Sequence, residues 1–177
     1  IGNEDSSVVV SFNGEIYNFR ELRDSLMGKG HTFRTQSDTE VVVHAYEEWG
    51  KQCVEHFRGM FAFCSVDMRK RCLFLARDHF GIKPLVYFQW GGCFACASEL
   101  QALKACEEFP WALNLPALDQ YLWLQYIPAP QTVFRRVRKL PPAHRMTVQF
   151  DGTTEGPERY WDTQFHPDDH RTEDGWL

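Results

Sequence analysis

Two neighbouring residues place hydrogen-bond donors where they could act on a carbonyl group. Asn13 and Gly14 follow the β-branched run 7–12, so an amide side chain and an unhindered backbone N–H meet at the end of a predicted strand. Two such donors are what an oxyanion hole needs in acyl transfer. An Asn-Gly pair also favours tight turns that need a positive φ. The two residues by themselves leave both interpretations open.

A carboxylate forms the second candidate. Ser37 and Glu40 have the spacing of a capping box, which predicts a helix that begins after Ser37 and ends before Gly50. Asp38 then lies in the first helical turn, where it complements the helix dipole. Pointing outward from the same place, it could instead bind an ammonium group.

The elements that must position these residues alternate along the chain. Asn18 predicts the start of a helix that Gly28 closes, so residues 7–28 are expected to form a strand, a tight turn at Asn13-Gly14 and a helix. Further strands are predicted at 60–67, 72–76, 85–90, 93–98 and 145–150, with helices at 99–105 and around Leu118. From residue 151 onward the chain is polar, and no further element is predicted.

Composition limits the function classes. The chain has 177 residues, 44% of them hydrophobic, and a formal net charge of -5. These values are typical of one globular domain. No apolar run approaches the roughly 20 residues of a membrane span, and the first residues do not resemble a signal peptide. The acidic excess argues against a nucleic-acid partner, and the basic cluster at 135–139 is interpreted as a solvated loop in preference to a phosphate or acidic-partner site.

The six cysteines are predicted to be buried free thiols. Cys93 and Cys96 form a C-x-x-C pattern, but on a strand an odd spacing points the two sulfurs to opposite faces. No second pair completes a tetrahedral site. The sequence therefore predicts no metal site.

Five blocks, in order, resemble the glutaminase domain of glutamine-dependent asparagine synthetases: FNGEIYNFRELR, TQSDTEVVVHAYEEWG, FRGMFAF, LFLARDHFGIKPL and FACASELQAL. Residues 121–144, followed by Tyr160-Trp161, resemble the connection toward the synthetase domain of that family. A series of long blocks is far more specific than any one short motif.

The resemblance implies a class II glutamine amidotransferase of the N-terminal-nucleophile hydrolase type. Its α+β fold is a four-layer αββα sandwich, expected here to be incomplete at the N-terminus. Residues 1–110 would be a partial glutaminase domain, 111–162 its end and the connection toward a synthetase domain, and 163–177 a truncated linker.

The resemblance also implies roles. In the family an N-terminal Cys attacks the side-chain amide of glutamine, and its own α-amine serves as the base. Asn13, through its side chain, and Gly14, through its backbone N–H, would form the oxyanion hole. Asp38 would bind the α-amino group of glutamine, and Glu15 would line the substrate pocket. Asn13, Gly14 and Asp38 are expected to surround one empty pocket.

A second group of residues matches the family's RDxxGxKPL loop, which is expected to be mainly architectural: Arg77, Asp78, Gly81, Lys83 and Pro84.

Two features of the family are absent from these residues. The chain opens with Ile1, which has no nucleophilic side chain, and none of the six cysteines combines a thiol with a free α-amine. The 177 residues alone are therefore expected to be inactive. No S-G-G-x-D-S loop is present, so no cofactor is expected in this chain, and ATP and Mg²⁺ would belong to a synthetase domain.

The expected parent is a cytoplasmic enzyme that converts aspartate, glutamine and ATP to asparagine, glutamate, AMP and pyrophosphate. Its expected partners are glutamine and a synthetase domain in cis, and the family allows a homodimer. Two alternatives stay open: a related amidotransferase with a different acceptor, and a non-catalytic glutaminase-like interaction domain.

Overall fold

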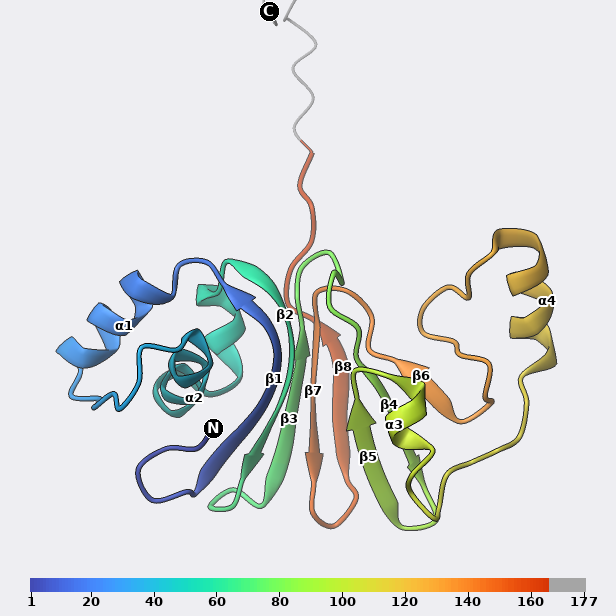
Figure 1. The fold of residues 1–177 in the computed structure, drawn as a ribbon, viewed down its shortest axis with the longest axis horizontal. Coiled ribbons are helices and arrows are strands. Elements are labelled where there is room, and N and C mark those ends of the chain that lie inside the picture. Colours follow the sequence, from blue (N-terminus) through green and yellow to red (C-terminus); the bar gives the residue numbers. More distant parts are fainter. Residues whose placement is uncertain (166–177) are drawn as a thin grey trace, which may run out of the picture.

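The computed structural model describes residues 1–165 (Figure 1). Its helices are α1 (Phe19–Gly28), α2 (Asp38–Trp49), the 3-10 helix η1 (Gly50–His56), α3 (Leu100–Leu103) and α4 (Leu115–Leu124). Its strands are β1 (Val8–Ile16), β2 (Gly59–Asp67), β3 (Cys72–Arg77), β4 (Val86–Trp90), β5 (Cys93–Ala97), β6 (Val137–Lys139), β7 (His144–Gln149) and β8 (Thr154–Arg159).

The strands form two sheets in which every pairing is antiparallel. The larger sheet has the order β1-β2-β3-β7-β8 and the smaller one the order β5-β4-β6. Figure 1 shows α1 and α2 on one face of the larger sheet, the smaller sheet on its other face, and α3 beyond the smaller sheet. The predicted αββα arrangement is therefore confirmed.

Three apolar cores lie between these layers. The first joins α1 and α2 to the larger sheet and contains four phenylalanines with ring centroids 5.5–6.3 Å apart along their contacts, namely Phe57, Phe61, Phe63 and Phe74. The second, around Leu75 and Leu85, lies between the two sheets. The third covers the outer face of the smaller sheet around Phe88 and Phe109. Each buried side chain of this size contributes about 1.5–3 kcal/mol, so the cores hold the sheets face to face.

The predicted turn at Asn13-Gly14 is wrong. β1 continues through both residues to Ile16 and stays paired with β2, Gly14 opposite Phe61. Gly14 has a φ of +151°, and a methyl group there would overlap the Met60 carbonyl oxygen and lie 2.7 Å from the Phe61 Cα. Glycine is used here for close backbone approach within a strand, which local turn statistics do not distinguish from a hairpin.

At the start of α2 the predicted Ser37 cap is present, but the predicted capping box with Glu40 is not. Ser37 caps the helix, because its Oγ accepts a hydrogen bond from the Thr39 N–H at 3.1 Å. Glu40 does not complete a capping box. Its carboxylate is buried and accepts hydrogen bonds from the N–H groups of Arg34 and Thr35, at 2.8 and 2.7 Å. It therefore fastens the connection before the helix.

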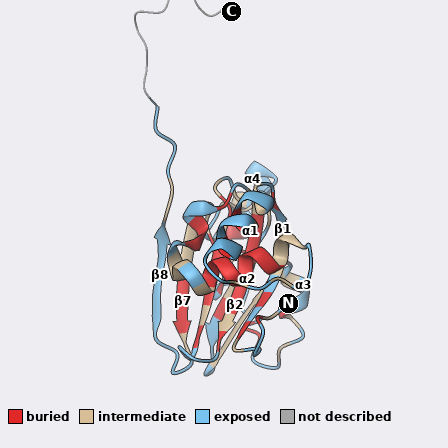
Figure 2. Cartoon of the chain, turned by 90° about the vertical axis from the view of Figure 1, so that its left-hand side faces the viewer, coloured by how far each residue is buried: buried red, intermediate tan, exposed pale blue. Residues whose placement is uncertain are grey.

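The C-terminal part contains strands that the sequence did not predict. β8 follows residue 151, where no element was expected, and β6 lies in the basic segment. All six residues of β8 are exposed, and Figure 2 shows the strand at the edge of the sheet. Its apolar content is too low for a pattern, and pairing with β7 alone defines it. Most of the predicted linker, residues 166–177, lies outside the described residues.

All six cysteines lie in the described part of the chain and are free, as predicted, but burial is confirmed for only three of them, and Cys93, Cys96 and Cys106 are partly exposed. Cys53, Cys64 and Cys72 are buried. Cys93 packs against the outer core and Cys96 against the core between the sheets, so their side chains do diverge. No helix within residues 1–165 is long and apolar enough to cross a membrane.

Candidate functional site

Three of the four predicted site residues border one cavity. Gly14, Glu15 and Asp38 line a space of about 360 Å³ together with Phe19, Gln36 and Ser37. The end of β1 supplies Gly14 and Glu15, and the start of α2 supplies Asp38. The capped N-terminus of α2 thus faces the end of β1.

Asp38 is held by one backbone contact. Its Oδ2 accepts a hydrogen bond from the Ile16 N–H at 3.0 Å, and its Oδ1 has the Ser37 hydroxyl at 3.4 Å. One carboxylate oxygen is therefore used to join α2 to β1. The other has only a weak hydroxyl donor and can accept from a ligand such as an ammonium group.

The Gly14 N–H points to the edge of β1 that faces away from β2, which we call the free edge. The N–H of Val10 bonds the Ile1 carbonyl oxygen at 2.7 Å, and the N–H of Ile16 bonds Asp38, so both point away from β2. Alternate residues of a strand direct their N–H groups to the same edge. Gly14 has the same parity as Val10 and Ile16. Its N–H therefore lies on this free edge, beside the Asp38 carboxylate.

Asn13 lies on the other side of the strand. Its Nδ2 donates to the Ser98 Oγ at 2.9 Å, and both residues line a second cavity of about 360 Å³ between β1, β2 and β5. Apolar side chains such as Phe94 and Leu85 form its walls. The expectation of one pocket around Asn13, Gly14 and Asp38 is therefore wrong, since adjacent strand residues face opposite sides.

Sequence reasoning gave Ser98 no role. The only signal for it was its place within the block FACASELQAL. One hydrogen of the Asn13 amide is used by Ser98, which orients the group and leaves the second N–H available.

The loop after β3 is built around two charged side chains. The Arg77 guanidinium donates three hydrogen bonds of 2.7 Å to the carbonyl oxygens of Gly81, Lys83 and Leu140. Burial lowers the pKa of Arg77, and the adjacent Asp78 opposes that shift. The contacts are all internal to the protein, which agrees with the architectural role expected for this loop.

Comparison with known proteins places this arrangement in a class. The fold resembles the glutamine phosphoribosylpyrophosphate amidotransferase of Bacillus subtilis, with a TM-score of 0.58, 19% identity and coverage of 88% of this chain and 30% of that one. It also resembles a class-II glutamine aminotransferase domain protein from Silicibacter pomeroyi, with a TM-score of 0.51, 14% identity and coverage of 85% and 67%. The chain thus has an amidotransferase-type fold.

Residues 1–161 match the glutamine amidotransferase domain family, and the chain belongs to that family. It is 36% identical over 156 residues to "Asparagine synthetase [glutamine-hydrolyzing] 3" of Bacillus subtilis. This match covers 88% of this chain and 25% of the relative. It is 40% identical over 161 residues to a putative asparagine synthetase of Mycobacterium tuberculosis, with coverage of 89% and 25%. The chain therefore spans about a quarter of the length of these relatives.

Proposed function

We propose that the whole protein is a glutamine-hydrolysing asparagine synthetase and that these residues form part of its glutamine site. The observation that carries the proposal is the free edge of β1, which presents the Gly14 N–H and the Asp38 carboxylate to one cavity. The similarity to asparagine synthetases over most of this chain supports it.

In this proposal glutamine lies along the free edge of β1. Its α-ammonium group binds the Asp38 carboxylate, and Glu15 lines the pocket beside it. A thiolate supplied from outside these 177 residues adds to the side-chain amide carbon, and negative charge develops on the amide oxygen. The Gly14 N–H stabilises that oxygen, and the second N–H of Asn13 adds to it only where the oxygen lies at the edge of β1 that faces away from β2, past which the Asn13 side chain can reach.

As the adduct collapses, the amide nitrogen takes up the proton that the α-amine of the nucleophile had accepted from the thiol and leaves as ammonia. Water then hydrolyses the remaining thioester to glutamate and restores the thiol. The ammonia is then used to amidate aspartate with ATP and Mg²⁺ in a synthetase domain. In this proposal the residues described here bind glutamine and stabilise the negative charge that develops on its side-chain amide oxygen.

The surface of α4 suits contact with that synthetase domain. Leu122 and Trp123 are 79% and 83% exposed, and Tyr121 and Leu124 beside them are about half exposed. An apolar patch of this kind is typical of an interface. We expect the synthetase domain to cover it in the whole protein.

The test uses the whole protein with Asp38→Asn. Glutamine-dependent synthesis should fall about 10–100-fold in kcat/KM, because hydrogen bonds to a charged group are worth about 1.5–3 kcal/mol. Ammonia-dependent synthesis should be unchanged, since ammonia does not use this carboxylate. Asp24→Asn, on the exposed side of α1, is the matched control and should alter neither reaction.

Equal loss of both reactions in Asp38→Asn would show that Asp38 only joins α2 to β1. A second measurement concerns the chain itself. The 177 residues should release no glutamate from glutamine, because the proposed mechanism needs a thiol and a free α-amine on one residue. Glutamate release that Asn13→Ala abolishes would contradict that mechanism.

A further inference from the structure

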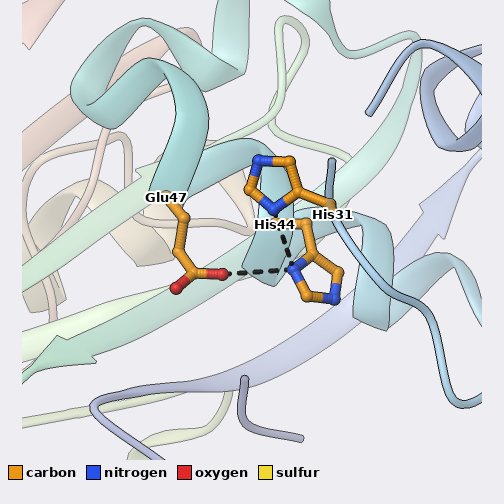
Figure 3. Close-up of side chains that lie close together, drawn as sticks. All are labelled: His31, His44 and Glu47. Carbon is orange, nitrogen blue, oxygen red and sulfur yellow. Dashed lines mark hydrogen bonds and ion pairs between the residues drawn. The ribbon is translucent and has the colours of Figure 1, made fainter. Parts of the chain in front are cut away.

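Two histidines and a glutamate meet on α2, away from the glutamine cavity. His44 and Glu47 lie one turn apart on the helix, and His31 comes from the connection between α1 and α2 (Figure 3). The His31 Nδ1 is 3.3 Å from the His44 Nδ1, which is 3.1 Å from the Glu47 Oε2. All three atoms lie within 4.8 Å of one another.

These separations suit a metal ion. Zinc binds imidazole nitrogen and carboxylate oxygen at about 2.0–2.2 Å, so two ligand atoms of a tetrahedral site are about 3.3 Å apart. Two of the three separations, 3.3 and 3.1 Å, agree with that value, and the third is no more than 4.8 Å. Without a metal, a proton on the His44 Nδ1 would be shared between the His31 ring nitrogen and the Glu47 carboxylate.

The groups behind the three side chains would fix them as ligands. The His31 Nε2 lies 3.3 Å from the Glu48 Oε2, so a proton on Nε2 leaves the Nδ1 lone pair directed at His44. The Glu47 Oε1 accepts a hydrogen bond from the Asn3 Nδ2 at 2.6 Å. Metal-bound histidines and carboxylates are usually oriented by such partners.

The surroundings of His44 limit its freedom further. Its side chain is 1% exposed and packs edge-on against Phe33, with ring centroids 4.6 Å apart. Its Nε2 is 3.9 Å from the Glu40 carboxylate. His31 and Glu47 are 16% and 17% exposed, so the site is open to solvent on one side and a water molecule can complete it.

We propose that His31, His44 and Glu47 bind a divalent transition-metal ion such as Zn²⁺. Two imidazoles and one carboxylate suit zinc and its neighbours better than Mg²⁺ or Ca²⁺, which prefer oxygen ligands alone. The ion would fasten the connection 29–37, which leads directly to Ser37 and Asp38, to the middle of α2. It thereby stabilises the folded state at a distance from the chemistry.

The experiment measures Co²⁺ and Zn²⁺ binding to the full chain after removal of metal by a chelator. We expect one Co²⁺ per chain, with visible d–d bands and without the sulfur charge-transfer band that cysteine ligands produce. Zn²⁺ should displace Co²⁺ and raise the melting temperature, because an ion that binds only the folded state stabilises it.

His31→Gln should weaken metal binding by more than the roughly 10–100-fold expected for losing an outer partner, and Glu48→Gln should weaken it by about that amount. His56→Gln is the matched control, since His56 stacks on Trp49 outside the cluster. A variant with His166→Asn and His170→Asn controls for histidines outside the described residues.

If His31→Gln does not fold, Glu47→Gln replaces it, and melting in chelator shows that the variant is folded. The proposal would be overturned if the wild-type chain binds no metal. It would also be overturned if His31→Gln and Glu47→Gln both bind metal as tightly as wild type. Binding that disappears with His166 and His170 would overturn it as well. The three residues would then be a hydrogen-bonded pair of histidines with a carboxylate.

Discussion

The buried carboxylate of Asp78 offers a sharp test of how the loop after β3 is held. Asp78 is 1% exposed, and each of its oxygens accepts two backbone hydrogen bonds. Oδ1 accepts from Phe80 and Ile82 at 3.1 and 3.0 Å, and Oδ2 from Phe61 and Lys83 at 3.2 and 3.0 Å. The Phe61 contact joins this loop to β2.

Asp78→Asn keeps the shape of the side chain but replaces one oxygen by an NH2 group. Because both oxygens are doubly occupied, either orientation of the amide points NH2 at two backbone donors. Each buried donor left without a partner costs about 1–3 kcal/mol, so the free energy of unfolding should fall by about 2–6 kcal/mol. With a urea m-value of about 2 kcal/mol/M, the midpoint should fall by about 1–3 M.

Urea unfolding followed by circular dichroism measures this change. Asp151→Asn is the control: Asp151 is exposed, accepts a single backbone bond from Thr153 at 2.8 Å, and should change stability by no more than about 0.5 kcal/mol. Equal midpoints for the two variants would refute the reasoning, because the four contacts of Asp78 would then contribute no more than one exposed turn.

Two further predictions concern a glycine and a histidine. Gly14→Ala should destabilise the fold by about 3 kcal/mol or more, because the added methyl group overlaps the Met60 carbonyl oxygen, whereas Gly28→Ala, with no atom within 4 Å, should be neutral or stabilising by up to about 1 kcal/mol. Urea midpoints of the two variants separate these outcomes, and similar midpoints would contradict the close approach of β1 to β2. Burial lowers the pKa of His79 below its ordinary value of 6.5, and Asp78 opposes that shift. The unfolded chain then binds a proton more readily, so the stability due to neutral His79 is present above pH 6.5 and is lost as the pH falls toward the lower folded pKa. His79→Gln should lose less stability than wild type between pH 7.5 and 5.5 in urea titrations, and an equal loss would contradict this assignment.

Local patterns in the sequence predicted most of the elements. The helices α1 and α2, the Ser37 cap and the hairpin around Gly91-Gly92 all lie where spacing and turn chemistry placed them. These features depend on residues a few positions apart, so sequence spacing determines them. The resemblance to asparagine synthetases added the expectation of four layers, in which two sheets lie between two layers of helices.

The elements that were missed depend on a partner strand. β1 extends past Asn13-Gly14 because β2 lies close enough to pair with it, and β8 is a strand because β7 is beside it. Neither segment carries an apolar pattern that distinguishes it from a turn or a polar tail.

The same division holds for the candidate sites. The sequence by itself indicated which groups could donate to an oxyanion or bind an ammonium group, namely the Asn13 side chain, the Gly14 backbone N–H and the Asp38 carboxylate. Only the tertiary structure decided that β1 separates Asn13 from the other two, and that His31 meets His44 across 13 positions of chain. Residue types define what a side chain can do, but distances between segments arise only when the layers pack against one another.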